Sequence, residues 1–190
     1  MSEFEFPAPS FSFGVIGGLL QAVFYLFHLS QNQTNDMTNF FVFYLRLSVN
    51  ADPQYCDADD GSNYAKTVVR RYRQSLDILK EAMSVFESHG TVCNVVLGDT
   101  IDGSAKSIGK HFDCIQEIKT STGQNCHYVL GNHDYYNFNR TELKELLIPE
   151  SHQEECSAAR LYYSFSPHPG QRFIILDGYD HSLIGASSEH

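Results

Sequence analysis

The sequence is poor in basic residues. It has 13 lysines and arginines against 23 aspartates and glutamates, which gives a formal net charge of −10 over 190 residues. Because nonspecific affinity for nucleic acids comes from clustered lysine and arginine side chains, this balance argues against a nucleic-acid binder. The single basic cluster covers residues 70–73, and its simplest interpretation is the solvated face of a helix.

The sequence also lacks the cysteine patterns of disulfide-rich and zinc-binding proteins. Its five cysteines are an odd number and contain no C-x-x-C pair, so we expect reduced thiols. The N-terminus carries Glu3 and Glu5 and no basic residue before its first apolar stretch, which is the wrong charge for a secretory signal peptide. These features predict an intracellular, cytoplasmic protein.

No apolar run has the length of a membrane span. The segment 14–29 is only 16 residues long and contains Gln21 and His28, whereas a spanning helix needs about 20 apolar residues. We therefore expect no membrane partner, and a transmembrane helix here is the lesser alternative. The 42% apolar and 13% aromatic content fits one globular domain over residues 1–190, and we expect a monomer.

Residues 17–50 differ in composition from the rest of the chain. They contain one acid, Asp36, and one base, Arg46, beside five phenylalanines. Joining Ile16 directly to Ala51 gives one compact apolar strand, so this segment interrupts the first predicted core strand. We interpret residues 17–50 as an atypical insertion or as non-native coding sequence, such as an unspliced intron. A genuine membrane or partner-binding segment is the alternative.

After residue 63 the apolar residues recur at regular steps. A stripe with alternating steps of four and three predicts an amphipathic helix that ends near Gly90. The stripe consists of Tyr72, Leu76, Leu79, Met83 and Phe86. A strand over 91–97, a helix over 104–118 and a strand over 127–130 then form a β-α-β unit.

The C-terminal third of the sequence continues the α/β pattern. Asn139 and Glu142 form a capping-box pattern that begins a short helix through Leu147. Two further strands are expected over 161–165 and 173–176, joined by a proline-rich turn. The fold class is therefore α/β with buried strands, and polar residues follow the strand ends.

Two of the predicted strands are followed by a glycine and by metal-type ligands. Asp99 follows the first glycine, Asn132 and His133 follow the second, and Asp52 and Gln54 lie upstream. Carboxylate and amide oxygens at neighbouring strand ends suit a hard divalent metal, and an imidazole beside them can reach a phosphate oxygen. Each motif alone is explained by a turn or a helix cap. The combination favours a two-metal phosphoesterase site.

The order of these motifs resembles that of the calcineurin-like metallophosphoesterases: Asp-x-His or Asp-x-Gln, Gly-Asp-x-x-Asp, and Gly-Asn-His-Asp. Within that superfamily the sequence is most similar to the manganese-dependent ADP-ribose/CDP-alcohol diphosphatases, which carry Asp-x-Gln-Tyr. The resemblance implies a metallophosphoesterase-type α/β/β/α sandwich, here C-terminally truncated. The similar stretches are 11–16, 52–64, 70–79, 97–103, 131–140 and 162–182.

The resemblance also implies roles for the candidate residues. Asp52 and Gln54 would bind the first of two divalent metal ions, Mn²⁺ in this family, with Asp99 bridging both and Asn132 on the second. His133 would stabilise or protonate the leaving group. The implied reaction is hydrolysis of the pyrophosphate bond of small nucleotide diphosphates, such as ADP-ribose and CDP-choline, to a nucleoside monophosphate. Four nearby aromatic side chains either stack on the base or pack in the core: Tyr55, Tyr135, Tyr136 and Phe138.

The family's remaining ligands, a later histidine and a closing Gly-His-x-His, have no counterpart in the sequence. His181 and His190 lack that context, and His168 is expected at the surface. With only Asp99 and Asn132 for the second metal, we expect this chain to be catalytically feeble or inactive. The alternatives are a noncatalytic truncated product or nucleotide-binding fragment, and a metallophosphoesterase for cyclic nucleotides or phosphoproteins.

Overall fold

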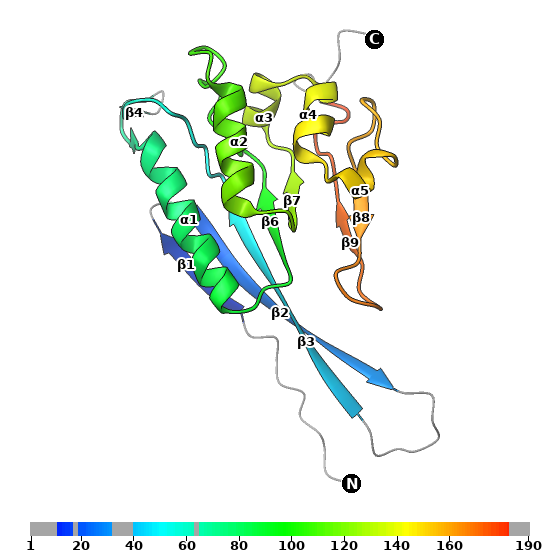
Figure 1. Cartoon of the computed structure of the whole chain (residues 1–190). Coiled ribbons are helices and arrows are strands. Elements are labelled where there is room, and N and C mark those ends of the chain that lie inside the picture. The colour runs from blue at the N-terminus through cyan, green and yellow to red at the C-terminus, as the bar shows by residue number, and fades with distance from the viewer. Residues whose placement is uncertain (1–10, 17–18, 32–39, 63–64, 183–190) are drawn as a thin grey trace.

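A five-stranded mixed sheet forms the centre of the molecule (Figure 1). The structure is a computed structural model that describes residues 11–16, 19–31, 40–62 and 65–182. The strand order is β1-β2-β3-β6-β7; the first three strands pair antiparallel, whereas β3, β6 and β7 run parallel. These strands are β1 (Phe11–Ile16), β2 (Leu19–Gln31), β3 (Phe40–Ala51), β6 (Cys93–Leu97) and β7 (Cys126–Val129).

Two long helices, α1 (Tyr72–Ser88) and α2 (His111–Thr122), pack beside each other against the sheet (Figure 1). The predicted apolar stripe of α1 is confirmed, because Leu76, Leu79 and Phe86 are buried. The helix ends where predicted, before Gly90, which has a φ of +66°.

Helix α2 begins later than predicted. The expected start at residue 104 is wrong, because the Asp102 carboxylate accepts hydrogen bonds from the Ser104 amide (2.9 Å) and hydroxyl (2.6 Å). These bonds hold a turn in place of a helix. Gly109, with a φ of +73°, then redirects the chain into α2. The connection from β6 to α2 is therefore a longer loop than the sequence indicates.

The C-terminal part of the chain packs beside β7 (Figure 1). The predicted capping box of α4 is confirmed: Asn139 Oδ1 accepts from the Glu142 amide at 2.9 Å, and Glu142 Oε2 accepts from the Asn139 amide at 2.8 Å. The two expected strands pair as an antiparallel hairpin. The elements are α3 (Asn132–Asn137), α4 (Arg140–Leu147), α5 (Glu150–Gln153), β8 (Tyr163–Phe165) and β9 (Phe173–Ile175), with the short strands β4 (Gly61–Ser62) and β5 (Val69–Arg70) upstream.

The strand that leads into Asp52 is β3. Its Leu45, Leu47 and Val49 side chains are buried in the main core, and the strand pairs directly with β6. Residues 11–16, which we expected to precede Asp52, instead form the outer strand β1, with β2 between them and β3. The interpretation of 17–50 as an insertion stays a prediction, although its last residues contribute to the core.

The apolar segment 14–29 lies in strands rather than in a helix where the structure describes it. The lesser alternative of a transmembrane helix there is therefore wrong. Within the described part of the chain, no helix is long and apolar enough to cross a membrane.

Candidate metal centre

All five predicted site residues follow the carboxyl ends of the three parallel strands. Asp52 and Gln54 come after β3, Asp99 after β6, and Asn132 and His133 after β7. Because parallel neighbours end at the same edge of a sheet, the three loops meet there (Figure 1). The convergence expected from the motifs is thus present in the fold.

The two glycine turns touch each other. A Cβ atom added to Gly98 would lie 2.8 Å from the amide nitrogen of Gly131, and Gly98 also has a φ of +84°. A Cβ atom added to Gly131 would lie 2.3 Å from both the amide nitrogen and Oδ1 of Asp99. No larger residue fits at either position without a shift of the backbone. The glycines therefore bring the tips of β6 and β7 into contact.

Three of the candidate ligands have a strained backbone. The φ angles are +51° for Asp52, +43° for Gln54 and +49° for Asp99. Among the described non-glycine residues, only Lys66 also has a positive φ. The left-handed conformation costs such residues about 1–2 kcal/mol each. Strain of this kind is concentrated at functional sites, so its clustering here supports the assignment.

Hydrogen bonds hold Asp99 in this conformation. Its Oδ1 accepts from the His133 amide at 2.9 Å, and its Oδ2 accepts from Gln54 Nε2 at 3.2 Å. Its backbone carbonyl accepts from the Gln54 amide, also at 2.9 Å. One aspartate therefore links the loops after β3, β6 and β7, as a residue shared by two metals would have to do.

The Asp52 and Asp99 carboxylates face each other. Although Asp52 as a residue is exposed, loss of water around its carboxyl group raises its pKa above the ordinary value, and the adjacent Asp99 raises it further; His133 opposes both. Among the described residues, neither carboxylate forms an ion pair with a lysine or arginine. Two like charges placed together without a cation are the arrangement that a divalent metal stabilises.

The candidate ligands are two carboxylates and two amides. In the described part of the chain, no group of three or more His, Cys, Asp and Glu side chains is placed to share a metal. The available donors are therefore carboxylate and amide oxygens from Asp52, Gln54, Asp99 and Asn132, which suit hard cations such as Mn²⁺ or Mg²⁺.

The His133 imidazole is held in one tautomer. Its Nδ1 atom accepts a hydrogen bond from the Gly103 amide at 2.8 Å, so the neutral ring carries its proton on Nε2. The Asp102 carboxylate lies 3.6 Å from Nδ1, beyond hydrogen-bonding distance, and is instead paired with Arg70 at 2.8 Å. The Nε2–H group is thus free to donate to a phosphate or leaving-group oxygen.

Asp134 has a structural role that the motif alone did not assign. Its buried carboxylate accepts hydrogen bonds from the amides of Thr100 (3.0 Å) and Gly131 (2.8 Å), and burial raises its pKa to about 7. It therefore fixes the two glycine turns to each other. The residue was visible as the fourth member of Gly-Asn-His-Asp, but its position after the ligands gave no sign of this role.

Asn137 also supports the site and had no sequence signal. Its Nδ2 donates to the backbone carbonyls of His133 (2.8 Å) and Asp102 (3.0 Å), and its Oδ1 accepts from the Lys106 amide at 2.9 Å. The side chain is fully buried. It joins the loop after β6 to helix α3, which carries His133.

A buried ion pair fastens the loop after β9 to helix α4, and a hydrogen bond from Tyr135 fastens it to α3. Arg140 Nη2 lies 2.5 Å from Asp177 Oδ2, and the Tyr135 hydroxyl donates to Asp177 Oδ1 at 2.9 Å. The side chains of Arg140 and Asp177 are 9% and 0% exposed. The similarity over 162–182 thus includes a residue that positions α3.

Packing explains three of the four aromatic side chains near the motifs. Tyr55 and Phe138 are buried, and the Tyr55 hydroxyl donates to Glu117 at 2.8 Å, whereas Tyr135 is bound to Asp177. Tyr136 differs, because it is 48% exposed and its ring centroid lies 5.5 Å from that of His133. It is the aromatic residue of this set that is available to a ligand.

The chain is similar in sequence to known proteins. No protein-family model matches the chain. A manganese-dependent ADP-ribose/CDP-alcohol diphosphatase from Danio rerio is 35% identical over 149 residues, which are 73% of this chain and 46% of that protein. The Arabidopsis thaliana and Homo sapiens proteins of the same name are 37% and 34% identical, over 76% and 73% of this chain and 45% of each relative. The chain is homologous to these diphosphatases.

A solved structure confirms the fold class. The crystal structure of a dimetal phosphatase from Danio rerio superposes with a TM-score of 0.67 at 34% identity, covering 76% of this chain and 47% of that one. The chain therefore has the mixed α/β fold of a metallophosphoesterase. It spans about half the length of the curated relatives it matches.

Proposed function

We propose that this chain carries the metal-binding half-site of a manganese-dependent diphosphatase. Its reaction is hydrolysis of the pyrophosphate bond of small nucleotide diphosphates, such as ADP-ribose and CDP-alcohols including CDP-choline, with release of a nucleoside monophosphate. The observation that carries this proposal is the meeting of Asp52, Gln54, Asp99, Asn132 and His133 at one edge of the sheet. The names of the homologues supply the substrate class.

Two Mn²⁺ ions fit the donor set. Asp52 and Gln54 would hold the first ion, Asp99 would bind both, and Asn132 would bind the second. The proximity of the Asp99 carboxylate, which raises the pKa of Asp52, supports a cation between them. When bound, the metals would act as Lewis acids on the pyrophosphate.

His133 has a defined part in the reaction. Because the Gly103 amide occupies Nδ1, the proton on Nε2 is the one offered to the substrate. Donation of this hydrogen bond to the leaving phosphate oxygen stabilises the charge that develops as the bond breaks. Asn137 and Asp134 hold the backbone on which His133 sits.

A noncatalytic nucleotide-binding protein is the second candidate. The observation in its favour is the ligand set itself, which contains no histidine and gives the second metal only Asp99 and Asn132. Two protein ligands bind a divalent ion weakly. Such a chain would bind Mn²⁺ and nucleotide without turnover.

Release of AMP from ADP-ribose separates the two candidates. The purified chain is incubated with MnCl₂ and ADP-ribose, and AMP is measured by chromatography. The proposed function predicts manganese-dependent release that is feeble in this chain, because the second metal has only Asp99 and Asn132, and that His133→Ala abolishes. His89→Ala, at the exposed end of α1, is the control and retains the wild-type rate. Nucleotide binding without any release would support the second candidate.

We also propose that the protein is a cytoplasmic monomer. All five cysteines are free and buried, which fits a reducing compartment. Subcellular fractionation and sedimentation test these two points. Recovery with secreted proteins or a dimer at micromolar concentration would contradict them.

A further inference from the structure

A cavity of about 380 Å³ lies directly beside the metal centre. One of its walls is Gln54, whose amide nitrogen is 3.2 Å from Asp99 Oδ2. Its lining also includes Arg70 of β5 and Arg71 directly before α1, and Val69 and Ile78 add apolar surface. Gln54 therefore belongs both to the candidate metal centre and to the lining of this cavity.

The three arginines of the basic cluster 70–73 have different surroundings. Arg70 is paired with the buried Asp102 at 2.8 Å. The Asp102 carboxylate also lies 3.6 Å from His133 Nδ1. Arg73 is paired with Asp57 and Asp59, both at 2.7 Å, and does not line the cavity. The interpretation of the cluster as a solvated helix face is thus wrong for Arg70, which is in strand β5.

Arg71 is the arginine of the cluster without an acidic partner. Its guanidinium donates to the neutral side chain of Gln74 at 3.3 Å and forms no ion pair with the described residues. The side chain is exposed and lines the cavity. The first turn of α1 contains no acidic residue.

The Tyr72 ring, which also lines the cavity, packs against Gly61. A Cβ atom added to Gly61 would lie 2.9 Å from Tyr72 Cε2, so the ring already packs against the backbone of β4. The part of the Tyr72 ring that contacts Gly61 is therefore not available to a ligand. Arg71 supplies a cationic group to the cavity, beside the apolar side chains of Val69 and Ile78.

We propose that this cavity binds the second phosphoryl group of the diphosphate substrate, the one that the reaction does not attack, through Arg71. The inference rests on the proposed function, because a pyrophosphate linkage places two phosphoryl groups side by side. With one group at the metals, we place its neighbour in the adjoining cavity. The planar guanidinium offers paired donors that match phosphate oxygens. Val69 and Ile78 border the space left for the organic substituent.

Equilibrium binding of ADP and AMP tests this assignment. Both are titrated calorimetrically into the full chain in MnCl₂, because AMP has one phosphoryl group and ADP adds the second. We expect the wild-type chain to bind ADP more tightly than AMP. Arg71→Gln should weaken ADP binding about tenfold and change AMP binding less than about twofold, since it removes a charged hydrogen-bond donor.

Arg73→Gln is the matched control. It removes the same charge from the first turn of α1, but its partners are Asp57 and Asp59 rather than the cavity. Both nucleotide affinities should stay within about twofold of wild type. Among the described residues Arg71 makes one side-chain hydrogen bond, and the ion pairs of Arg73 are exposed, so both variants should unfold close to the wild-type temperature.

Three results would overturn the assignment: equal affinity of the wild-type chain for ADP and AMP, wild-type ADP affinity in Arg71→Gln, or equal losses for both nucleotides. The outcome is separable from that of the proposed function. One informative result is that Arg71→Gln loses the preference for ADP while the wild-type chain releases no AMP from ADP-ribose. That result would support the phosphoryl site and reject catalysis. Turnover with an unchanged Arg71→Gln would reject the phosphoryl site alone.

Discussion

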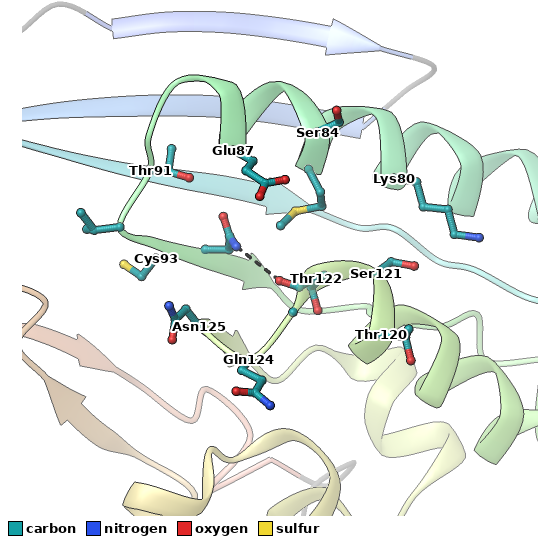
Figure 2. A pocket seen from close by; sticks show the side chains of 14 residues that line it. Lys80, Ser84, Glu87, Thr91, Cys93, Thr120, Ser121, Thr122, Gln124 and Asn125 are labelled. Carbon is teal, nitrogen blue, oxygen red and sulfur yellow. Dashed lines mark hydrogen bonds between the residues drawn. The ribbon is translucent and has the colours of Figure 1, made fainter.

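The parallel strands have a cavity near each end, and the two ends differ in chemistry. The cavity at the amino ends of β6 and β7 is the larger, at about 460 Å³, but its only charged residues are Lys80 and Glu87 (Figure 2). The cavity at the carboxyl end, about 380 Å³, adjoins two facing carboxylates and an arginine without an acidic partner. Size therefore does not identify the functional end.

Backbone conformation separates the two ends as clearly as charge does. Three non-glycine residues at the carboxyl end have a positive φ, whereas the lining of the amino-end cavity has this conformation only at Gly123. Cys93, which lines that cavity, is no candidate nucleophile because burial raises its pKa to about 11. The site is identified by its strained backbone and by two neighbouring carboxylates, and not by the volume of its cavity.

The largest expected contrast comes from one substitution made at each end. Gly131→Ala places a Cβ atom 2.3 Å from Asp99, so it should destabilise the fold by on the order of 3 kcal/mol and abolish Mn²⁺ binding. Gly123→Ala meets no atom within 4 Å, so it should cost about 1–3 kcal/mol through its backbone conformation (φ +75°, ψ −179°) and leave Mn²⁺ binding unchanged. Thermal denaturation and manganese titration measure both effects. Equal Mn²⁺ affinities in the two variants would remove the contrast.

Acid should weaken the amino end of β7 through His127. Burial and the nearby His152 lower the His127 pKa to about 4. The unfolded chain takes up this proton near pH 6.5 and the folded chain only near pH 4, so stability falls as the pH falls between these values. The expected loss is about 1–3 kcal/mol, measured by urea unfolding at pH 7 and pH 4.5.

His127→Gln should remove that part of the pH dependence. The His127 ring stacks on Phe165 with 3.4 Å between the ring centroids, so the variant should be less stable at neutral pH. Its free energy of unfolding should change less on acidification. The exposed His181→Gln serves as the control and should follow the wild-type curve. Identical slopes for wild type and His127→Gln would show that His127 is not the acid-sensitive group.

Thr122→Val should give the smallest effect. The Thr122 hydroxyl lies 2.5 Å from the Tyr128 hydroxyl and 3.0 Å from the Ile118 carbonyl oxygen, inside the wall of the amino-end cavity. Loss of these bonds should cost about 1 kcal/mol of unfolding free energy. Affinity for Mn²⁺ and for ADP should not change, and a change in either would give the amino end a functional role.

Local patterns predicted the elements that depend on near neighbours in sequence. The stripe of α1 and the Asn139–Glu142 capping box involve residues three or four positions apart, and both are as expected. The start of α2 was not predictable, because it depends on which hydrogen bonds Asp102 makes in the fold. The position of β3 was missed for a related reason: residues 11–16 and 45–51 both have strand-like composition, and only the pairing with β6 distinguishes them.

The ligands themselves were predictable, but their support was not. Asp52, Asp99 and His133 belong to short motifs that can be read from the sequence. Asn137 acts through its hydrogen-bond partners, and Arg71 through the lack of an acidic partner among the described residues. Only the folded chain determines either feature. Supporting residues of this kind require the structure because their contacts span more than 30 positions in the chain, as the Asn137–Asp102 bond does.

The most direct test of the metal centre is a Mn²⁺ titration of the wild-type chain and Asp99→Asn, followed by electron paramagnetic resonance of the free ion. The account predicts that the wild type binds Mn²⁺ and that Asp99→Asn loses at least about tenfold in affinity, because it removes the shared carboxylate. Asp113→Asn, exposed on α2, should bind as wild type does. In the absence of metal, Asp99→Asn should be no less stable than wild type, since the amide ends the repulsion with Asp52. Unchanged Mn²⁺ affinity in Asp99→Asn would contradict the account.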